Sequence, residues 1–204
     1  IVLRDAKPVF CEIDPATMNM DIAHMESLIS EKTRLLLPID YAGIPAEHDR
    51  IQQIASRHGL LVMDDAAQSL GSYYQGKPCG AWGDLAAFSF HETKNITCGE
   101  GGALLVNRPD WIQRATFLQE KGTDRSLVLS GVKSKYGWVD KGSSYLLSDL
   151  LAAMLLAQLE SAEYIMRQRK KVTAAYQELY APYAKQGCLC IARPPAGSSL
   201  NGHA

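Results

Sequence analysis

The chain has 204 residues, of which 47% are hydrophobic and 21% charged, a composition typical of a soluble globular protein with a sizeable core. Its net charge of -1 offers no basic field for nucleic acid, and no apolar run has membrane-spanning length. The five cysteines form no C-x-x-C pair, which argues against a disulfide framework or a zinc site and favours a reducing cytoplasm.

Strand-like and helix-like segments alternate along the chain, which predicts an α/β layer architecture. Strands are expected at 8–13, 34–38, 60–63, 86–90 and 102–106. Helices are expected at 21–30, 47–58, 109–120 and 148–180, with Gly59 closing the second of them. The polar, Gly-rich stretch 121–144 is interpreted as a long loop.

Two residues that follow strands carry the strongest chemical signal. Asp65 follows the strand at 60–63, and Lys94 lies in a polar turn after the strand at 86–90. Because ligands of open α/β sheets bind at the carboxyl ends of strands, both side chains are expected to face one crevice. A lysine can form a Schiff base with pyridoxal phosphate (PLP), and an aspartate can keep its pyridine nitrogen protonated. Singly, a solvated lysine and a loop aspartate are the commoner interpretations; together they point to a PLP site.

Neighbouring residues add to this interpretation. Gln68 could reach the phenolic oxygen of the cofactor and Ser89 could donate to its phosphate, although an exposed helix residue and a satisfied strand serine are the ordinary alternatives. The glycines at 99–102 match neither the G-x-G-x-x-G nor the G-x-x-x-x-G-K-[ST] spacing, which excludes those nucleotide-binding templates. His91 has no second ligand at metal spacing and no G-x-S-x-G elbow is present, so neither a metal site nor a Ser-His-Asp triad is expected.

Three segments, in this order, resemble the DegT/DnrJ/StrS-type sugar aminotransferases. Segment 64–71, DDAAQSLG, is similar to the family's E-D-A-A-Q/H-x-x-G, and segment 88–102 contains F-S-F, K-N and G-E-G-G. Segment 142–159 is similar to G-x-N-Y-R-M-S-D-L-Q-A-A followed by Q-L. The strings at 91–95, 120–126 and 142–145 most resemble the branch that makes dTDP-4-amino-4,6-dideoxygalactose for enterobacterial common antigen.

The resemblance implies an α/β fold: the large domain of a fold-type I PLP-dependent transferase, with a mostly parallel sheet and helices on both faces, truncated at both ends. Residues 1–145 would be the partial PLP-binding domain and 146–190 a long connecting helix. Residues 191–204 would begin a truncated C-terminal small domain. We therefore expect the chain to be the central piece of a longer protein.

By matched position, the resemblance assigns a role to each candidate residue. Lys94 would be the Schiff-base lysine and Asp65 the partner of the pyridinium nitrogen. Gln68 would contact the ring oxygen, Ala67 would pack on the ring, and Ser89 would bind the phosphate.

A sixth position would serve the neighbouring subunit of a homodimer with shared active sites. The family has Asn at this position, where it reaches the partner's cofactor phosphate, and this chain has Ser144, a shorter donor. The family Arg two residues further on is Leu146 here.

The activity implied is transfer of an amino group from glutamate to the 4-keto carbon of a dTDP-4-keto-6-deoxyhexose, with Lys94 moving the proton. One alternative is a PLP-dependent sugar dehydratase of the same fold, but that branch has His in place of the lysine. The other is a non-catalytic binding paralogue, against which the joint presence of Lys94, Asp65, Gln68 and Ser89 argues. Neither nucleic acid nor membrane insertion is expected.

Overall fold

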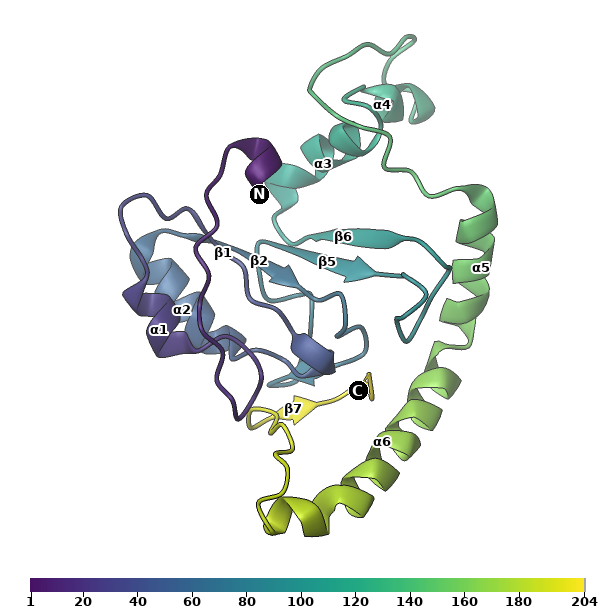
Figure 1. Cartoon of the computed structure of the whole chain (residues 1–204). Helices are drawn as coiled ribbons and strands as arrows, with labels where there is room; N and C mark the ends of the chain where they lie inside the picture. Colours follow the sequence, from purple (N-terminus) through teal and green to yellow (C-terminus); the bar gives the residue numbers. More distant parts are fainter. Residues whose placement is uncertain (204) are drawn as a thin grey trace.

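The computed structural model describes residues 1–203, and its main sheet has four strands in the order β1-β2-β5-β6 (Figure 1). The strands are β1 (Leu35–Leu36), β2 (Leu61–Asp65), β5 (Leu85–Ser89) and β6 (Gly102–Val106). The first three run parallel to one another, and β6 pairs antiparallel with β5. The expected α/β fold with a mostly parallel sheet is confirmed.

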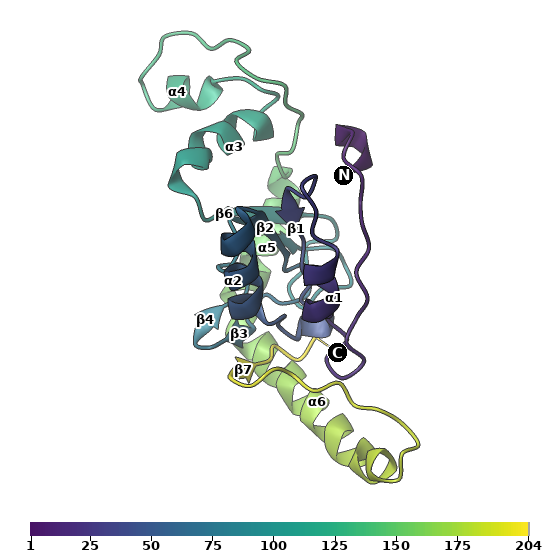
Figure 2. The ribbon, with the colours of Figure 1, turned by 90° about the vertical axis from the view of Figure 1, so that its left-hand side faces the viewer.

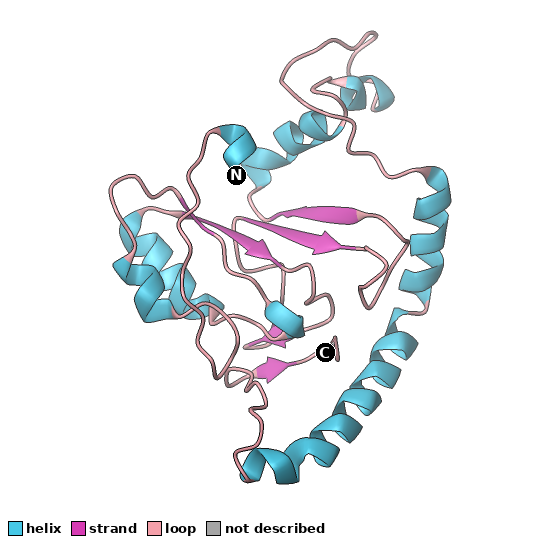
Figure 3. Cartoon of the chain, viewed as in Figure 1, coloured by secondary structure: helices cyan, strands magenta, loops and turns pink. Residues whose placement is uncertain are grey.

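Helices lie on both faces of this sheet (Figures 2 and 3). On one face are α1 (Ile22–Ser27) and α2 (His48–His58). Beyond the other face runs α5 (Asp149–Glu160), which continues into α6 (Ala162–Lys185). Shorter elements lie in the connections: η1 (Val2–Arg4), η2 (Tyr41–Gly43), η3 (Pro109–Trp111), α3 (Ile112–Gln119) and α4 (Arg125–Leu129).

Local sequence signals set the ends of α1 and α2. Asp21 caps α1, because its carboxylate accepts hydrogen bonds from the backbone N–H groups of Ala23 and His24. Gly59 ends α2 in the left-handed conformation, with φ of 63°, as expected from a glycine at this position. The two caps fix where α1 begins and where α2 ends.

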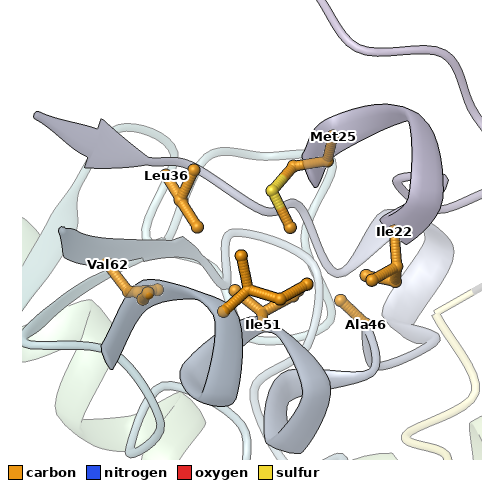
Figure 4. Packing of buried hydrophobic residues seen from close by; sticks show 8 residues of the cluster. Ile22, Met25, Leu36, Ala46, Ile51 and Val62 are labelled. Atoms are coloured by element: carbon orange, nitrogen blue, oxygen red, sulfur yellow. The ribbon is translucent and has the colours of Figure 1, made fainter. Parts of the chain in front are cut away.

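Two apolar clusters form the core. The larger joins α1 and α2 to the sheet, and Figure 4 shows Met25, Leu36, Ile51 and Val62 packed together there. The smaller surrounds Phe90, which lies just beyond the end of β5. Its partly buried neighbours come from the chain around α5 and α6, among them Leu147, Leu151 and Met166. The two clusters fix the sheet between its helical layers.

Several expected elements differ in the structure. No strand forms at 8–13, although Ile13 makes an isolated bridge to Met20. The expected helix at 148–180 is two helices that meet at Ser161, and the loop at 121–144 contains the short α4. A second, antiparallel sheet was not anticipated; its strands are β3 (Tyr73–Tyr74), β4 (Lys77–Pro78) and β7 (Ser198–Ser199).

Among residues 1–203, none of the helices combines the length and the apolar character that a membrane crossing requires.

Candidate functional site

Asp65 is the last residue of β2, and both its backbone and its side chain make hydrogen bonds. Its N–H donates to Pro38 (2.9 Å), and its carbonyl accepts from the N–H of Asp40 (3.0 Å). Its Oδ1 accepts from the N–H of Ala67 (3.1 Å), which fixes the turn that follows the strand. The side chain is partly buried, and its Oδ2 accepts no hydrogen bond among the described residues.

The turn after Asp65 presents Gln68 in one orientation. Gln68 Oε1 accepts a hydrogen bond from the N–H of Ala42 (2.6 Å), a residue in the left-handed region with φ of 57°. Because the oxygen is engaged, the NH₂ of the same amide remains as the donor. Ala67 precedes it and is also partly buried.

The neighbouring strand β5 brings Ser89 and the lysine turn to the same edge of the sheet. Asp65 pairs with Ala87 in the parallel register, so Ser89 lies two residues further along the adjacent strand. Ser89 Oγ accepts from the N–H of His91 (3.3 Å), and the N–H of Lys94 donates to the carbonyl of His91 (2.9 Å). Lys94 is partly buried, and within residues 1–203 its amine makes no hydrogen bond or ion pair.

A segment far away in the sequence links these two turns. The amide of Asn201 donates to the carbonyls of Gln68 (2.8 Å) and Leu70 (2.9 Å). The carbonyl of Asn201 in turn accepts from the amide of Asn95 (3.3 Å), the residue after Lys94. Figure 1 shows this end of the chain between the sheet and α6. Asn95 and Asn201 therefore belong to the site, although the sequence analysis did not identify them.

His203 is a further residue of this region that the sequence did not reveal. Its Nδ1 donates to Asn95 Oδ1 (3.0 Å), and Arg169 holds its backbone by donating to the carbonyl of His203 (2.9 Å). Burial lowers the pKa of His203, and the positive charges of Lys94 and Arg169 lower it further. No local motif marks this histidine, because only the folded chain brings it close to Lys94.

Ser144 lies elsewhere, at the base of the long loop before α5. Its backbone forms an isolated antiparallel bridge with Glu120, and its side chain is exposed. Among the described residues its hydroxyl makes no hydrogen bond. Among residues 1–203, no hydrogen bond joins Ser144 to the group formed by Asp65, Gln68, Ser89 and Lys94. Leu146, two residues further on, is also exposed.

The polar groups at the strand ends fit pyridoxal phosphate. Asp65 offers a carboxylate for a pyridinium nitrogen, and Gln68 offers an amide donor for a phenolic oxygen. Ser89 has a hydroxyl proton for a phosphate, and Lys94 has an amine that no other group among residues 1–203 engages. These four groups match the charges and donors that the cofactor needs.

Comparison with known proteins decides the family. The model of the DegT/DnrJ/EryC1/StrS aminotransferase family matches residues 1–193. The chain belongs to this family. The resemblance noted in segments 64–71, 88–102 and 142–159 is thereby confirmed.

Three relatives of this DegT-family chain illustrate what its members do. GDP-perosamine synthase of Caulobacter vibrioides is 36% identical over 176 residues, covering 86% of this chain and 46% of the synthase. The structure of DesI in the presence of its TDP-sugar product has a TM-score of 0.81 and 30% identity, covering 96% of this chain and 47% of DesI. Spr1654 of Streptococcus pneumoniae in its PLP form has a TM-score of 0.81 and 25% identity, covering 97% of this chain and 53% of Spr1654.

Pyridoxal phosphate is the cofactor of this family, and Spr1654 has been solved in both its PLP and its PMP form. The chain spans about half the length of the curated relatives it matches. The DegT-family fold is therefore shown for residues 1–193, which carry the aspartate and lysine turns.

Proposed function

We propose that the full-length protein is a PLP-dependent aminotransferase that acts on a nucleotide-linked keto sugar. The observation that carries this proposal is the placement of Asp65 and the Ser89–Lys94 turn on adjacent parallel strands of a DegT-family chain. Pyridoxal phosphate supplies an aldehyde that takes up the amino group and a ring that accepts an electron pair.

Each candidate residue has a distinct task in this proposal. Lys94 would hold the cofactor through its amine and would carry a proton to and from the reacting carbon. The carboxylate of Asp65 would keep the pyridine nitrogen protonated, because an adjacent negative charge favours the charged ring. Gln68 would orient the ring by donating to its oxygen, Ala67 would pack on the ring face, and Ser89 would donate to the phosphate.

We propose glutamate as the amino donor and a dTDP-4-keto-6-deoxyhexose as the acceptor, giving a 4-amino-4,6-dideoxyhexose of galacto configuration. The strings at 91–95, 120–126 and 142–145 support this choice, since they resemble the enterobacterial common antigen branch. DesI, whose structure includes a TDP-sugar product, supports a nucleotide sugar in general. GDP-perosamine synthase makes GDP-linked sugars the second candidate.

We also propose a homodimer in which Ser144 serves the partner's site. The helix α5 supports it, because Leu150 is 85% exposed and Met154, Leu156 and Leu159 are also exposed. These apolar side chains are spread around the helix, and an exposed apolar surface of this kind is covered in most folded proteins, for which a two-fold dimer is the commonest arrangement. The division into a cofactor domain at 1–145, a connecting helix at 146–190 and a small domain from 191 stays a prediction.

Borohydride labelling tests the central assignment. The full-length protein is incubated with pyridoxal phosphate, reduced, digested and mapped by mass spectrometry. The label should fall on Lys94, and Lys94→Ala and Lys94→Arg should lose both label and transamination, because arginine stays protonated. Lys32→Ala, which removes an exposed lysine, is the matched control and should retain both.

Two outcomes would contradict the assignment. A label on another lysine would refute the role of Lys94. An unlabelled protein that folds normally would favour the non-catalytic paralogue. Formation of 2-oxoglutarate from glutamate separates the aminotransferase from a dehydratase.

A further inference from the structure

Three titratable side chains are fully buried together next to residues 65–68, called the cofactor turn below because Asp65, Ala67 and Gln68 would face the cofactor. Asp40, His48 and Asp64 each have no exposed side-chain surface. His48 Nε2 lies 2.9 Å from Asp40 Oδ1 and 3.9 Å from Asp64 Oδ2. The indole of Trp82 stacks on the imidazole, with ring centroids 5.7 Å apart and planes 9° from parallel. The roles proposed above for the candidate residues use none of these groups.

Asp40 connects this cluster to the residues that would face the cofactor. Its Oδ1 accepts from the N–H of Ala46 (2.8 Å) as well as from His48, and its Oδ2 accepts from the hydroxyl of Ser69 (2.8 Å). Its own N–H donates to the carbonyl of Asp65 (3.0 Å). One carboxylate thus ties the loop 40–46 to the turn that carries Asp65 and Gln68.

Two further hydrogen bonds join the loop 40–46 to the chain after Asp65. The N–H of Ala42 donates to Gln68 Oε1 (2.6 Å), and the hydroxyl of Ser72 donates to the carbonyl of Gly43 (2.7 Å). Ala42 and Gly43 both have positive φ, of 57° and 78°, so the loop is in a conformation that an isolated chain rarely adopts. The contacts of the loop with its neighbours must hold it there.

Charge explains why a histidine occupies position 48. A carboxylate removed from water is costly unless a positive group lies against it. Asp64 is a second carboxyl beside His48. Its Oδ2 accepts from the N–H of Gly80 (3.1 Å), and its Oδ1 is buried and has no hydrogen-bond partner in the described part of the chain. The imidazole of His48 lies against both carboxyls, and its hydrogen bond completes the three that the carboxyl of Asp40 accepts.

We propose that the buried Asp40–His48 pair is a positioning element for the cofactor turn, setting the orientation of the Gln68 amide and the Asp65 carboxylate without touching the cofactor. This inference rests on the proposed function, which supplies the ligand. The hydrogen bonds of the Asp40–His48 pair, however, are present in the chain without cofactor. The position of the turn can therefore be measured independently of catalysis.

The test uses three variants of the full-length protein: Asp40→Asn, His48→Gln and the two combined. Each single variant removes one partner of the Asp40–His48 pair and leaves the other in place, whereas the combined variant replaces both partners by amides, which can hydrogen-bond to each other. Hydrogen exchange in the absence of cofactor reports the local structure through the amides of Ala42 and Ala67. Affinity for pyridoxal phosphate reports the consequence. His58→Gln, at the exposed end of the same helix, is the matched control.

Both single variants should lose protection at Ala42 and Ala67 and bind pyridoxal phosphate about tenfold more weakly. The combined variant should recover a large part of both properties, because the two substitutions act on one interaction. His58→Gln should match the wild type. If the single variants do not fold, the combined variant decides: a folded protein with protected amides supports the pair, and an unfolded or unprotected one overturns it.

A merely structural role has a different signature. It would lower protection equally at core amides such as Ile51 and Val62 and leave the affinity for pyridoxal phosphate unchanged, which would overturn the proposal. If the wild type binds no pyridoxal phosphate at all, the proposed function fails, while the exchange data on the free protein still decide whether the pair positions the turn.

Zinc titration provides a second test of the proposal, because the same cluster could instead bind a metal ion. Asp40, His48 and Cys79 bring one ligand atom each to within 4.8 Å of one another. A stoichiometric Zn²⁺ complex that Cys79→Ser abolishes and Cys98→Ser retains would assign the cluster to a metal and overturn the proposal. No zinc binding, with intact exchange protection, supports the ion pair.

Discussion

The side-chain amide of Asn201 donates a hydrogen bond of 2.8 Å to the backbone carbonyl of Gln68, across 133 residues of sequence. A second bond from the same amide reaches Leu70, and the N–H of Asn201 donates to Ser72 Oγ (3.0 Å). The turn that carries Gln68 is therefore held on one side by the loop at 40–46 and on the other by this asparagine.

Asn201→Ala should lower the free energy of unfolding by about 2–3 kcal/mol, because two carbonyls lose their donor. It should also weaken binding of pyridoxal phosphate. Urea unfolding and a cofactor titration measure the two effects. Asn107→Ala is the matched control, since that amide also donates to two carbonyls, those of Gly80 and Gly83. It should reduce stability similarly and leave cofactor affinity unchanged; equal effects of both variants on affinity would contradict the role of Asn201.

Gly43→Ala should be far more disruptive than an ordinary glycine substitution. A Cβ at Gly43 would collide with Asn201 Oδ1, and its φ of 78° already disfavours alanine. Gly59→Ala has a similar φ of 63° and open space around it, so it should cost only about 1–2 kcal/mol for the backbone conformation. Thermal unfolding of both variants compares them. Similar melting temperatures would show that Asn201 can move aside.

Asp65→Asn should lower turnover by about 100-fold or more, because a neutral amide cannot keep the pyridine nitrogen protonated. The free energy of unfolding should change by less than about 1 kcal/mol, since Asn Oδ1 can still accept from the N–H of Ala67. Steady-state kinetics and urea unfolding of the same preparation separate the two quantities. Near-normal kinetics would remove Asp65 from the mechanism.

The pH dependence of stability should report the buried carboxyl Asp64. Burial and the neighbouring charge of Asp40 raise the pKa of Asp64 to about 7. Burial alone would lower the pKa of His48, but its hydrogen bond to Asp40 and the charges of Asp40 and Asp64 give a net rise, which Lys77 opposes. For both groups the folded-state pKa lies above the unfolded one, so their contributions are lost as pH rises.

For Asp64 the window runs from its ordinary value of 3.8 to about 7. Over that range wild-type stability should fall relative to Asp64→Asn, by at most about 1.4 kcal/mol per pH unit. Chemical unfolding at several values between pH 5 and 8 measures this difference. Parallel curves for the two proteins would show that Asp64 does not titrate in this window.

Mixing inactive variants should reveal whether two subunits share a site. Lys94→Ala and Ser144→Ala should each be impaired alone. Hybrid dimers should regain part of the activity, because one of their two sites then has an intact lysine and an intact serine. Full activity of Ser144→Ala would show that the serine is dispensable, and absence of recovery after confirmed subunit exchange would count against a shared site.

Much of the sheet was predictable because its strands are short apolar runs bounded by polar turns. The expected bounds of β6 match the observed ones, and the expected bounds of β2 and β5 differ from the observed ones by one or two residues at each end. The segment at 8–13 is also a short, largely apolar run, yet Phe10 is 87% exposed and, within residues 1–203, no neighbouring strand pairs with the segment. An apolar run forms a strand only where a partner is present to satisfy the backbone.

The candidate site also contains some residues that the sequence indicates and others that only the fold reveals. Asp65 and Lys94 were proposed because each comes soon after an expected strand, and Gln68 and Ser89 because of their position near these two residues. The resemblance to the family then added Ala67 and Ser144. Asn201 and His203 carry no comparable local signal. Their placement depends on β7 pairing with β3, a contact between two-residue strands that no sequence pattern encodes.

The bond from Asn201 to Ser72 spans 129 residues, which sets an order of events during synthesis. A nascent chain can build β1, β2 and α2 as soon as they leave the ribosome, because their contacts are local in sequence. The Gln68 turn gains its last support only after residue 201 has emerged. Cofactor capture is therefore expected to follow translation of this region rather than accompany it, and translational pausing before residue 201 should leave a folded sheet whose Gln68 turn lacks the hydrogen bonds from Asn201.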